Sequence, residues 1–134
     1  MANIPTKYNA KDTVVTVNGV NITGFGENMI TWEKQEDYFT PQVGAQGDVV
    51  KSIHNNDLYT LTISVQSTCP QLKLLMSIAE QHEFFPIWCV NKPLGLRFGG
   101  SYASVQTHPN ISLGADEEDF EFTFVVFDGI TDVI

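Results

Sequence analysis

Only one segment of this chain has the apolar spacing of an amphipathic helix, and this restricts the fold more than any other feature. Leu72, Leu75, Met76 and Ala79 recur at successive helical turns. Neighbouring parallel strands need a crossover connection, usually a helix, whereas antiparallel strands do not. We therefore expect a mainly β fold, an antiparallel β-barrel or sandwich of about seven strands with one packed α-helix.

The start of this helix is predicted from residue types that favour a first turn. Proline is tolerated there because its missing N–H would have no partner inside the helix. Pro70 is therefore expected in the first turn of the helix, with Thr68 or Cys69 as the N-cap.

Two patterns predict strands most directly. Asn18-Gly19 joins two β-branched runs, and this dipeptide favours a type I′ hairpin turn because both of its residues adopt positive φ readily. Residues 58–66 alternate apolar and hydroxyl-bearing side chains, as in a half-buried antiparallel strand. The remaining strands are expected at residues 13–17, 20–23, 29–34, 85–90, 96–107 and 120–127.

Gly99-Gly100 interrupts the strand expected at 96–107. Glycines inside a strand mark a bulge or a place where another backbone comes close.

Residues 36–57 form a segment that is too long for an ordinary loop and too apolar for a disordered one. An apolar loop outside the core is expected to bury its side chains against a partner chain. The alternative is a lid folded over its own domain, containing a short hairpin through Gly44 to Gly47. The candidate contact residues are Tyr38, Phe39, Pro41, Val43, Gly44, Gly47, Val49, Val50 and Ile53.

The charge balance disfavours nucleic acids and anionic membranes as binding partners. The 134 residues, enough for a single domain, contain 7 basic and 16 acidic side chains, and the net charge is −9. Such a surplus also serves solubility, so charge alone does not assign a function. No apolar run indicates a signal peptide or a membrane span, and we expect a cytosolic setting.

No group of residues has a recognisable catalytic, cofactor-binding or metal-binding pattern, so no such site is expected. The histidines lack metal-ligand spacing, the cysteines lack a CxxC motif, and the acidic run at 116–119 lacks the glycine of a calcium loop. The two catalytic carboxylates of a glycosidase are brought together by the fold and need not be close in the sequence. The sequence therefore does not exclude a glycosidase, although no motif supports one. The residues considered are His54, His82, His108, Cys69 and Cys89.

A dense pattern of glycine, aromatic and branched residues occupies the first half of the chain. It reads V-x-V-x-G-x-x-I-x-G-F-G and then D-x-F-x-P-x-V-G-x-x-G-D-V-V. Its residues are Val17, Gly19, Ile22, Gly24, Phe25, Gly26, Asp37, Phe39, Pro41, Val43, Gly44, Gly47, Asp48, Val49 and Val50. The pattern resembles the N-terminal signature of tail tube proteins from contractile-tailed bacteriophages. The second half agrees with that family only in the order of its elements.

The resemblance implies a structural virion protein rather than an enzyme. Such proteins form hexameric rings that stack into the inner tail tube, which conducts DNA during ejection, and they contact sheath, tape-measure and baseplate proteins. It implies one tail tube domain over residues 1–134, with residues 36–57 as an inter-ring loop, assembled in the host cytoplasm.

The acidic surplus then has a function, because carboxylates facing the lumen would repel DNA and leave it a non-binding passenger. The candidate lumen-facing residues are Glu27, Glu33, Asp116, Glu117, Glu118, Asp119 and Glu121. Three alternatives remain: a baseplate or tail-completion protein, a secretion-type tube protein of the same fold, and a monomeric carbohydrate-binding β-sandwich. The last would display an aromatic platform such as Trp32, Trp88 and Tyr102.

Overall fold

The computed structural model describes residues 5–134, and within this range most of the regular secondary structure is β. It forms ten strands, one α-helix and one short 3-10 helix, η1 (Ala10–Asp12). The elements are β1 (Thr13–Val17), β2 (Val20–Asn21), β3 (Phe25–Lys34), β4 (Phe39–Val43), β5 (Val49–Ile53), β6 (Tyr59–Val65), α1 (Leu72–Gln81), β7 (Phe85–Asn91), β8 (Leu96–Thr107), β9 (Phe120–Val126) and β10 (Ile130–Val133).

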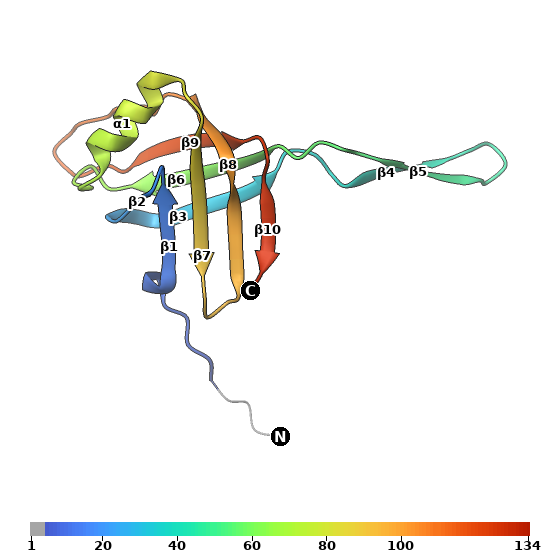
Figure 1. The fold of residues 1–134 in the computed structure, drawn as a ribbon, viewed down its shortest axis with the longest axis horizontal. Helices are drawn as coiled ribbons and strands as arrows, with labels where there is room; N and C mark the ends of the chain where they lie inside the picture. The colour runs from blue at the N-terminus through green and yellow to red at the C-terminus, as the bar shows by residue number, and fades with distance from the viewer. Residues whose placement is uncertain (1–4) are drawn as a thin grey trace.

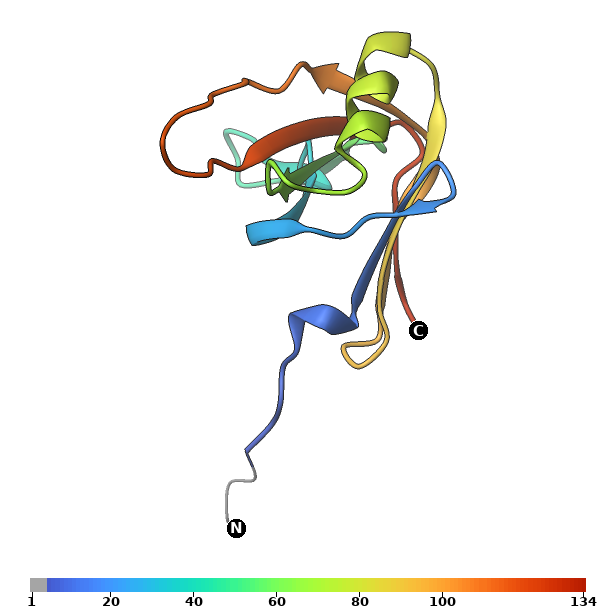
Figure 2. The same cartoon turned by 90° about the vertical axis from the view of Figure 1, so that its left-hand side faces the viewer.

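Eight strands form one antiparallel sheet that folds over into two layers. Its order is β2-β1-β7-β8-β9-β6-β3, with β10 paired to β8. The first part of β8 pairs with β7 and β10, whereas its last residues pair with β9. Strands β1, β7, β8 and β10 therefore run across β9, β6 and β3 (Figures 1 and 2). The result is sandwich-like rather than a closed barrel, and the predicted mainly antiparallel fold with one helix is confirmed.

Glycine permits the close approach of β7 and β8 at the bend. Gly99 has φ 144°, and a Cβ at this position would overlap the carbonyl oxygen of Ile87. The predicted close backbone approach at Gly99-Gly100 is therefore confirmed.

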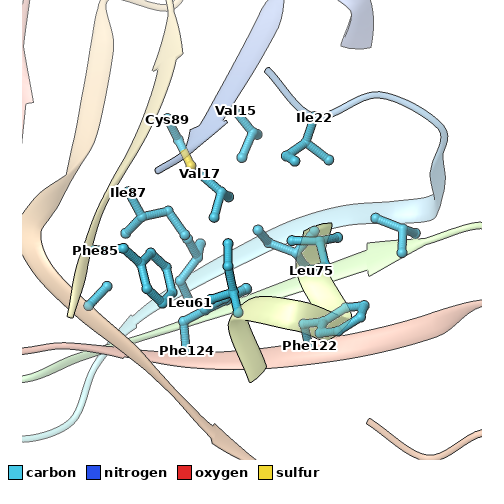
Figure 3. Packing of buried hydrophobic residues seen from close by; sticks show 14 of the residues in the cluster. Val15, Val17, Ile22, Leu61, Leu75, Phe85, Ile87, Cys89, Phe122 and Phe124 are labelled. Carbon is cyan, nitrogen blue, oxygen red and sulfur yellow. The ribbon is translucent and has the colours of Figure 1, made fainter. Parts of the chain in front are cut away.

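The core lies between the two layers and under α1 (Figure 3). Alternate residues of each strand point inward, as the period of a half-buried strand requires. The helix contributes Leu75, Ile78 and Ala79. The largest fully buried side chains are Phe122, Phe124, Leu61, Ile63, Leu75, Ile87, Val15, Val17, Val65, Val126 and Cys89.

The predicted Asn18-Gly19 hairpin is confirmed, but the predicted N-cap of the helix is wrong. Asn18 and Gly19 have φ of 51° and 80°, as a type I′ turn needs. The helix begins at Leu72, and its N-cap is Gln71 rather than Thr68 or Cys69. The Gln71 Oε1 atom accepts hydrogen bonds from the N–H and hydroxyl of Thr23, so a tertiary contact holds the preceding residues in a turn.

The expected number of strands was too low. Strands β4 and β5 occupy the segment that was expected to be a loop, and β10 follows the last expected strand. The alternative for residues 36–57 was a lid that contains a short hairpin through Gly44 to Gly47. The structure has this hairpin, but the hairpin projects away from the body and is not a lid (Figure 1).

Candidate assembly surfaces

The hairpin β4–β5 carries the apolar residues predicted to contact a partner. It leaves the sheet between β3 and β6 and extends far beyond it (Figure 1). Every residue of β4 is exposed, and in β5 only Ser52 is partly covered. Val43 and Val49 expose 71% and 67% of their surface. These side chains therefore gain little burial in a single copy.

The register of the hairpin places most of its apolar residues on one face. Directly opposed residues share a face, and the opposed pairs here include Phe39 with Ile53 and Val43 with Val49. The side chains of this apolar hairpin face are Phe39, Pro41, Val43, Val49, Lys51 and Ile53.

Lys51 is the one charged member of the apolar hairpin face. Its Nζ lies 4.5 Å from the centroid of the Phe39 ring, a cation–π contact that leaves the ammonium at the surface.

The opposite face of the hairpin is more polar, and two of the predicted residues lie on it. Val50 pairs with Gln42, and Tyr38 precedes Phe39, so their side chains point away from the apolar hairpin face. Here His54 Nε2 lies 2.6 Å from Thr40 Oγ1. The remaining predicted residues, Gly44 and Gly47, form the turn.

The turn requires glycine for its conformation. Gly47 has φ 91°, and its N–H donates to the carbonyl of Gly44, whose own N–H donates to the carbonyl of Asp48.

The apolar hairpin face continues into a pocket at the base of the hairpin. Trp32 and Tyr59 stack there with their ring centroids 4.5 Å apart. These rings, Phe39 and Pro41 are among the residues that line a hollow of about 650 Å³. The charged residues Lys34, Glu36 and Asp37 also line this hollow, so the apolar hairpin face ends in a pocket of mixed character.

The carboxylates predicted to face the lumen lie in three places: on the sheet, at its border and in the loop at residues 108–119. Glu33 pairs with Thr60, and Glu121 pairs with Ser64, on the side of β3, β6 and β9 that faces away from the core. We call this surface the hydroxyl face because most of its side chains are Thr or Ser. It consists of Thr31, Glu33, Thr60, Thr62, Ser64, Glu121, Thr123 and the buried Val125.

Glu27 and Asp119 border the hydroxyl face where the strands end. Together with Glu121 they are among the residues that line a hollow of about 420 Å³. Desolvation, the nearby charge of Glu117 and a hydrogen bond with Glu117 raise the pKa of Asp119, while a hydrogen bond from the backbone N–H of Glu27 opposes this.

Glu117 belongs to the loop at residues 108–119, not to the hydroxyl face. Its Oε1 accepts from the N–H of Ser67 at 2.8 Å, and Asp116 and Glu118 lie exposed beside it. The structure therefore brings Glu27, Glu33, Asp119 and Glu121 to one surface and leaves Asp116, Glu117 and Glu118 outside it.

The exposed apolar residues of this loop were not predicted from the sequence. Ile111 and Leu113 expose 58% and 81% of their surface. The signal was present, because residues 108–119 are also longer than an ordinary loop and contain apolar residues.

The described residues contain no cluster of three or more His, Cys, Asp or Glu side chains that could hold a metal ion. Both cysteines are buried and unpaired, and burial raises the pKa of Cys89 to about 12. The cysteines are therefore thiols of the core.

Within residues 5–134, no helix is both long and apolar enough to span a membrane.

Trp32 and Trp88, two of the three aromatic residues considered for a carbohydrate platform, do not share a face. Trp32 packs toward the core side against Phe98. Trp88 lies on the outer side of β7, because its neighbours Ile87 and Cys89 point inward, and it carries Arg97 over its ring.

Comparison with known proteins gives a family match and several structural matches. The model of the family described as bacteriophage PhiTE tail tube protein matches residues 9–88. No curated protein sequence matches the chain.

The structural matches extend over almost the whole chain. A chain of the anti-feeding prophage cap, described as the tube terminating cap, aligns with a TM-score of 0.70 and 11% identity, covering 99% of this chain and 97% of the other. A chain of the PVC sheath–tube complex of an extracellular contractile injection system gives 0.68 and 14%, covering 96% and 93%. The PVC sheath/tube terminator gives 0.65 and 13%, covering 98% and 100%. At these identities the likeness shows a shared fold.

Proposed function

This chain belongs to the bacteriophage PhiTE tail tube protein family, and on that premise we propose that it polymerises as stacked hexameric rings into the inner tube of a contractile tail. The tube conducts DNA during ejection, and the protein is structural rather than enzymatic. The observation that carries this proposal is the apolar hairpin face, which a single copy leaves exposed.

The hairpin acts as the stacking element between rings. A two-stranded hairpin without further packing is at best marginally stable in water. Burial of each apolar side chain contributes roughly 1.5–3 kcal/mol, and here that burial is possible only against another chain. Residues 36–57 thus serve as the inter-ring segment of a single tail tube domain spanning residues 1–134.

Rings close through the edges of the sheet. Within residues 5–134, β2, β3 and β10 each pair on one side only. Closure of a sheet into a barrel removes such edges, which otherwise invite uncontrolled pairing. Six copies joined through these edges make one wide barrel, with the hydroxyl face toward the lumen.

The lumen carries the acidic surplus. Glu27, Glu33, Asp119 and Glu121 lie on or beside the hydroxyl face and repel the phosphates of passing DNA. Asp116, Glu117 and Glu118 lie at the end of each ring. An assembled tube with a neutral or basic bore would contradict this assignment.

The tube lies inside the virion tail after assembly in the host cytoplasm. Its outer side binds the sheath protein, and its ends meet the tape-measure and baseplate proteins. Sheath and tube occur together in the PVC complex whose chain shares this fold.

A tube terminator is the second candidate. Two of the chains that share this fold come from tube terminators, the anti-feeding prophage cap and the PVC sheath/tube terminator. A terminator forms a single ring and does not propagate. The length of the assembly therefore separates the two functions.

Electron microscopy of the purified full-length protein tests the proposal. We expect long hollow tubes from the unmodified chain and folded subunits without tubes from Val43→Asp/Val49→Asp. The matched control is Gln42→Asp/Val50→Asp, which places the same two charges on a directly opposed pair of the opposite hairpin face. Single rings from the unmodified chain would favour a terminator, and monomers would refute assembly.

A further inference from the structure

Resting on the proposed stacking, we propose that the apolar hairpin face of one copy docks on the loop at residues 108–119 of a second copy in the next ring. Ile111 and Leu113 of that loop pack against Val43 and Val49, and its exposed carboxylates pair with Lys51. The occupant of the hairpin surface is thus a second copy of this chain.

The hairpin and the loop lie at opposite ends of the molecule. The hairpin emerges beside Tyr59, which pairs with Val126. The loop leads into Phe120, which pairs with Val65 at the other end of β6. The seven residues of β6 separate these ends by about 20 Å, and Figure 1 shows the hairpin and the loop on opposite sides of the body.

Stacking brings these unlike ends together. Rings related by translation along one axis form a head-to-tail interface, in which the hairpin end of one copy meets the loop end of the next. Such an interface propagates without closing, as a tube requires.

The loop is held at both ends while its middle is uncovered. His108 Nε2 lies 3.3 Å from Glu80 on α1, and Pro109 is buried. At the other end Glu117 accepts from Ser67. Because the ends are already held, docking costs less conformational entropy than ordering a free segment would.

Charge complements the apolar contact. Lys51 is the one basic residue of the hairpin, and within residues 5–134 no carboxylate lies within ion-pair distance of it. Asp116 and Glu118 in the loop likewise have no basic partner among the described residues. An opposite charge on the second copy would give each of these groups a partner.

Another exposed apolar cluster is excluded by its position. Phe84, Tyr102 and Phe127 make edge-to-face contacts at the surface. Phe127 directly follows Val126, so this cluster lies at the hairpin end. Head-to-tail stacking therefore does not bring it against the hairpin of the next ring.

The test uses paired cysteines in the full-length chain. Val43→Cys combined with Leu113→Cys should give a ladder of disulfide-linked multimers under mild oxidation, seen on a non-reducing gel. Val43→Cys combined with Tyr102→Cys is the control and should give no ladder, because Tyr102 is also surface-exposed but lies near the hairpin end. The native cysteines are buried and remain silent in both.

A second experiment tests the contact energetically. Leu113→Asp should raise the critical concentration for tube formation about tenfold or more, as loss of an interface anchor does. Lys51→Glu should also weaken assembly, and Lys51→Glu with Asp116→Lys and Glu118→Lys should restore part of it. Unchanged melting temperatures would show that each variant is folded.

The outcomes separate the two proposals. Tubes from the unmodified chain, with no ladder and no effect of Leu113→Asp, would overturn the docking site and leave the tube function standing. An unmodified chain that never forms tubes would overturn both.

Discussion

The strand pairs β6–β9 and β4–β5 are built from similar residues and have opposite surroundings. In β6–β9, Leu61, Ile63 and Phe124 are fully buried between the layers. In β4–β5, Val43 and Val49 are directly opposed and largely exposed. Both pairs are antiparallel, so local pairing does not explain the difference. Apolar strand residues in the first pair complete the core of one copy, and those in the second pair require another chain.

Truncation in the core pair should have the largest effect on stability. Phe124→Ala removes a ring that is fully buried and stacks edge-to-face with Phe85. We expect a loss of about 3–5 kcal/mol in the free energy of unfolding, because the cavity adds to the lost transfer energy. Urea denaturation of the non-assembled chain measures this, and a loss below about 1 kcal/mol would contradict the assigned core.

The bend of β8 should be the next most sensitive position. In Gly99→Ala the new Cβ meets the backbone of Ile87 at a φ of 144°, which L-residues rarely adopt. We expect a loss of about 2–4 kcal/mol from strain and overpacking. Gly114→Ala is the control, since a Cβ there has open space. Equal thermal stability of these two variants would show that β7 and β8 do not approach as closely as described.

Elements with a clear local pattern of burial or of backbone conformation were predictable from the sequence. The alternation of residues 58–66 predicted β6, because one face of that strand is buried. Asn18-Gly19 predicted its turn, because few other residues adopt both positive φ values.

Elements that depend on distant contacts were not predictable. Pro70 favours a first helical turn, yet Gln71 binds Thr23 and the helix starts later. Strand β10 is short and fully exposed, so it has no burial pattern. Strands β4 and β5 are also exposed and have no burial pattern, and Pro41 and the turn glycines favour a loop at these positions.

The candidate surfaces were predictable in composition and not in geometry. An excess of apolar residues identified the segment at 36–57, but only its strand conformation shows that Val50 points away from Val49. Likewise, the acidic residues near 116–121 are adjacent in sequence, whereas Glu121 shares a face with Glu33 and Glu118 does not.

Replacing one valine by alanine in each strand pair measures the difference in burial directly. Val126→Ala in the core should cost about 2–3 kcal/mol, whereas Val49→Ala in the hairpin should stay within about 0.5 kcal/mol of the unmodified chain. The reason is that Val126 is fully buried and Val49 is 67% exposed. Thermal unfolding of non-assembled subunits measures both. Equal losses would mean that the hairpin is packed within its own chain.

The smallest expected effect concerns the carboxylates at the end of the hydroxyl face. Desolvation and then the charge of Glu117 raise the pKa of Asp119 above its ordinary 3.8, so its contribution to stability is present below that value and is lost as the pH rises through the folded pKa. Asp119→Asn keeps an acceptor for the Glu27 N–H and removes the repulsion. We therefore expect a slightly higher melting temperature than the unmodified chain at pH 7, and a difference that shrinks as the pH falls below the ordinary value. Asp116→Asn, an exposed residue of the same loop, is the control and should change neither. A melting temperature at pH 7 that is unchanged or lower in Asp119→Asn would show that the repulsion between Asp119 and Glu117 does not limit the stability of this end of the sheet.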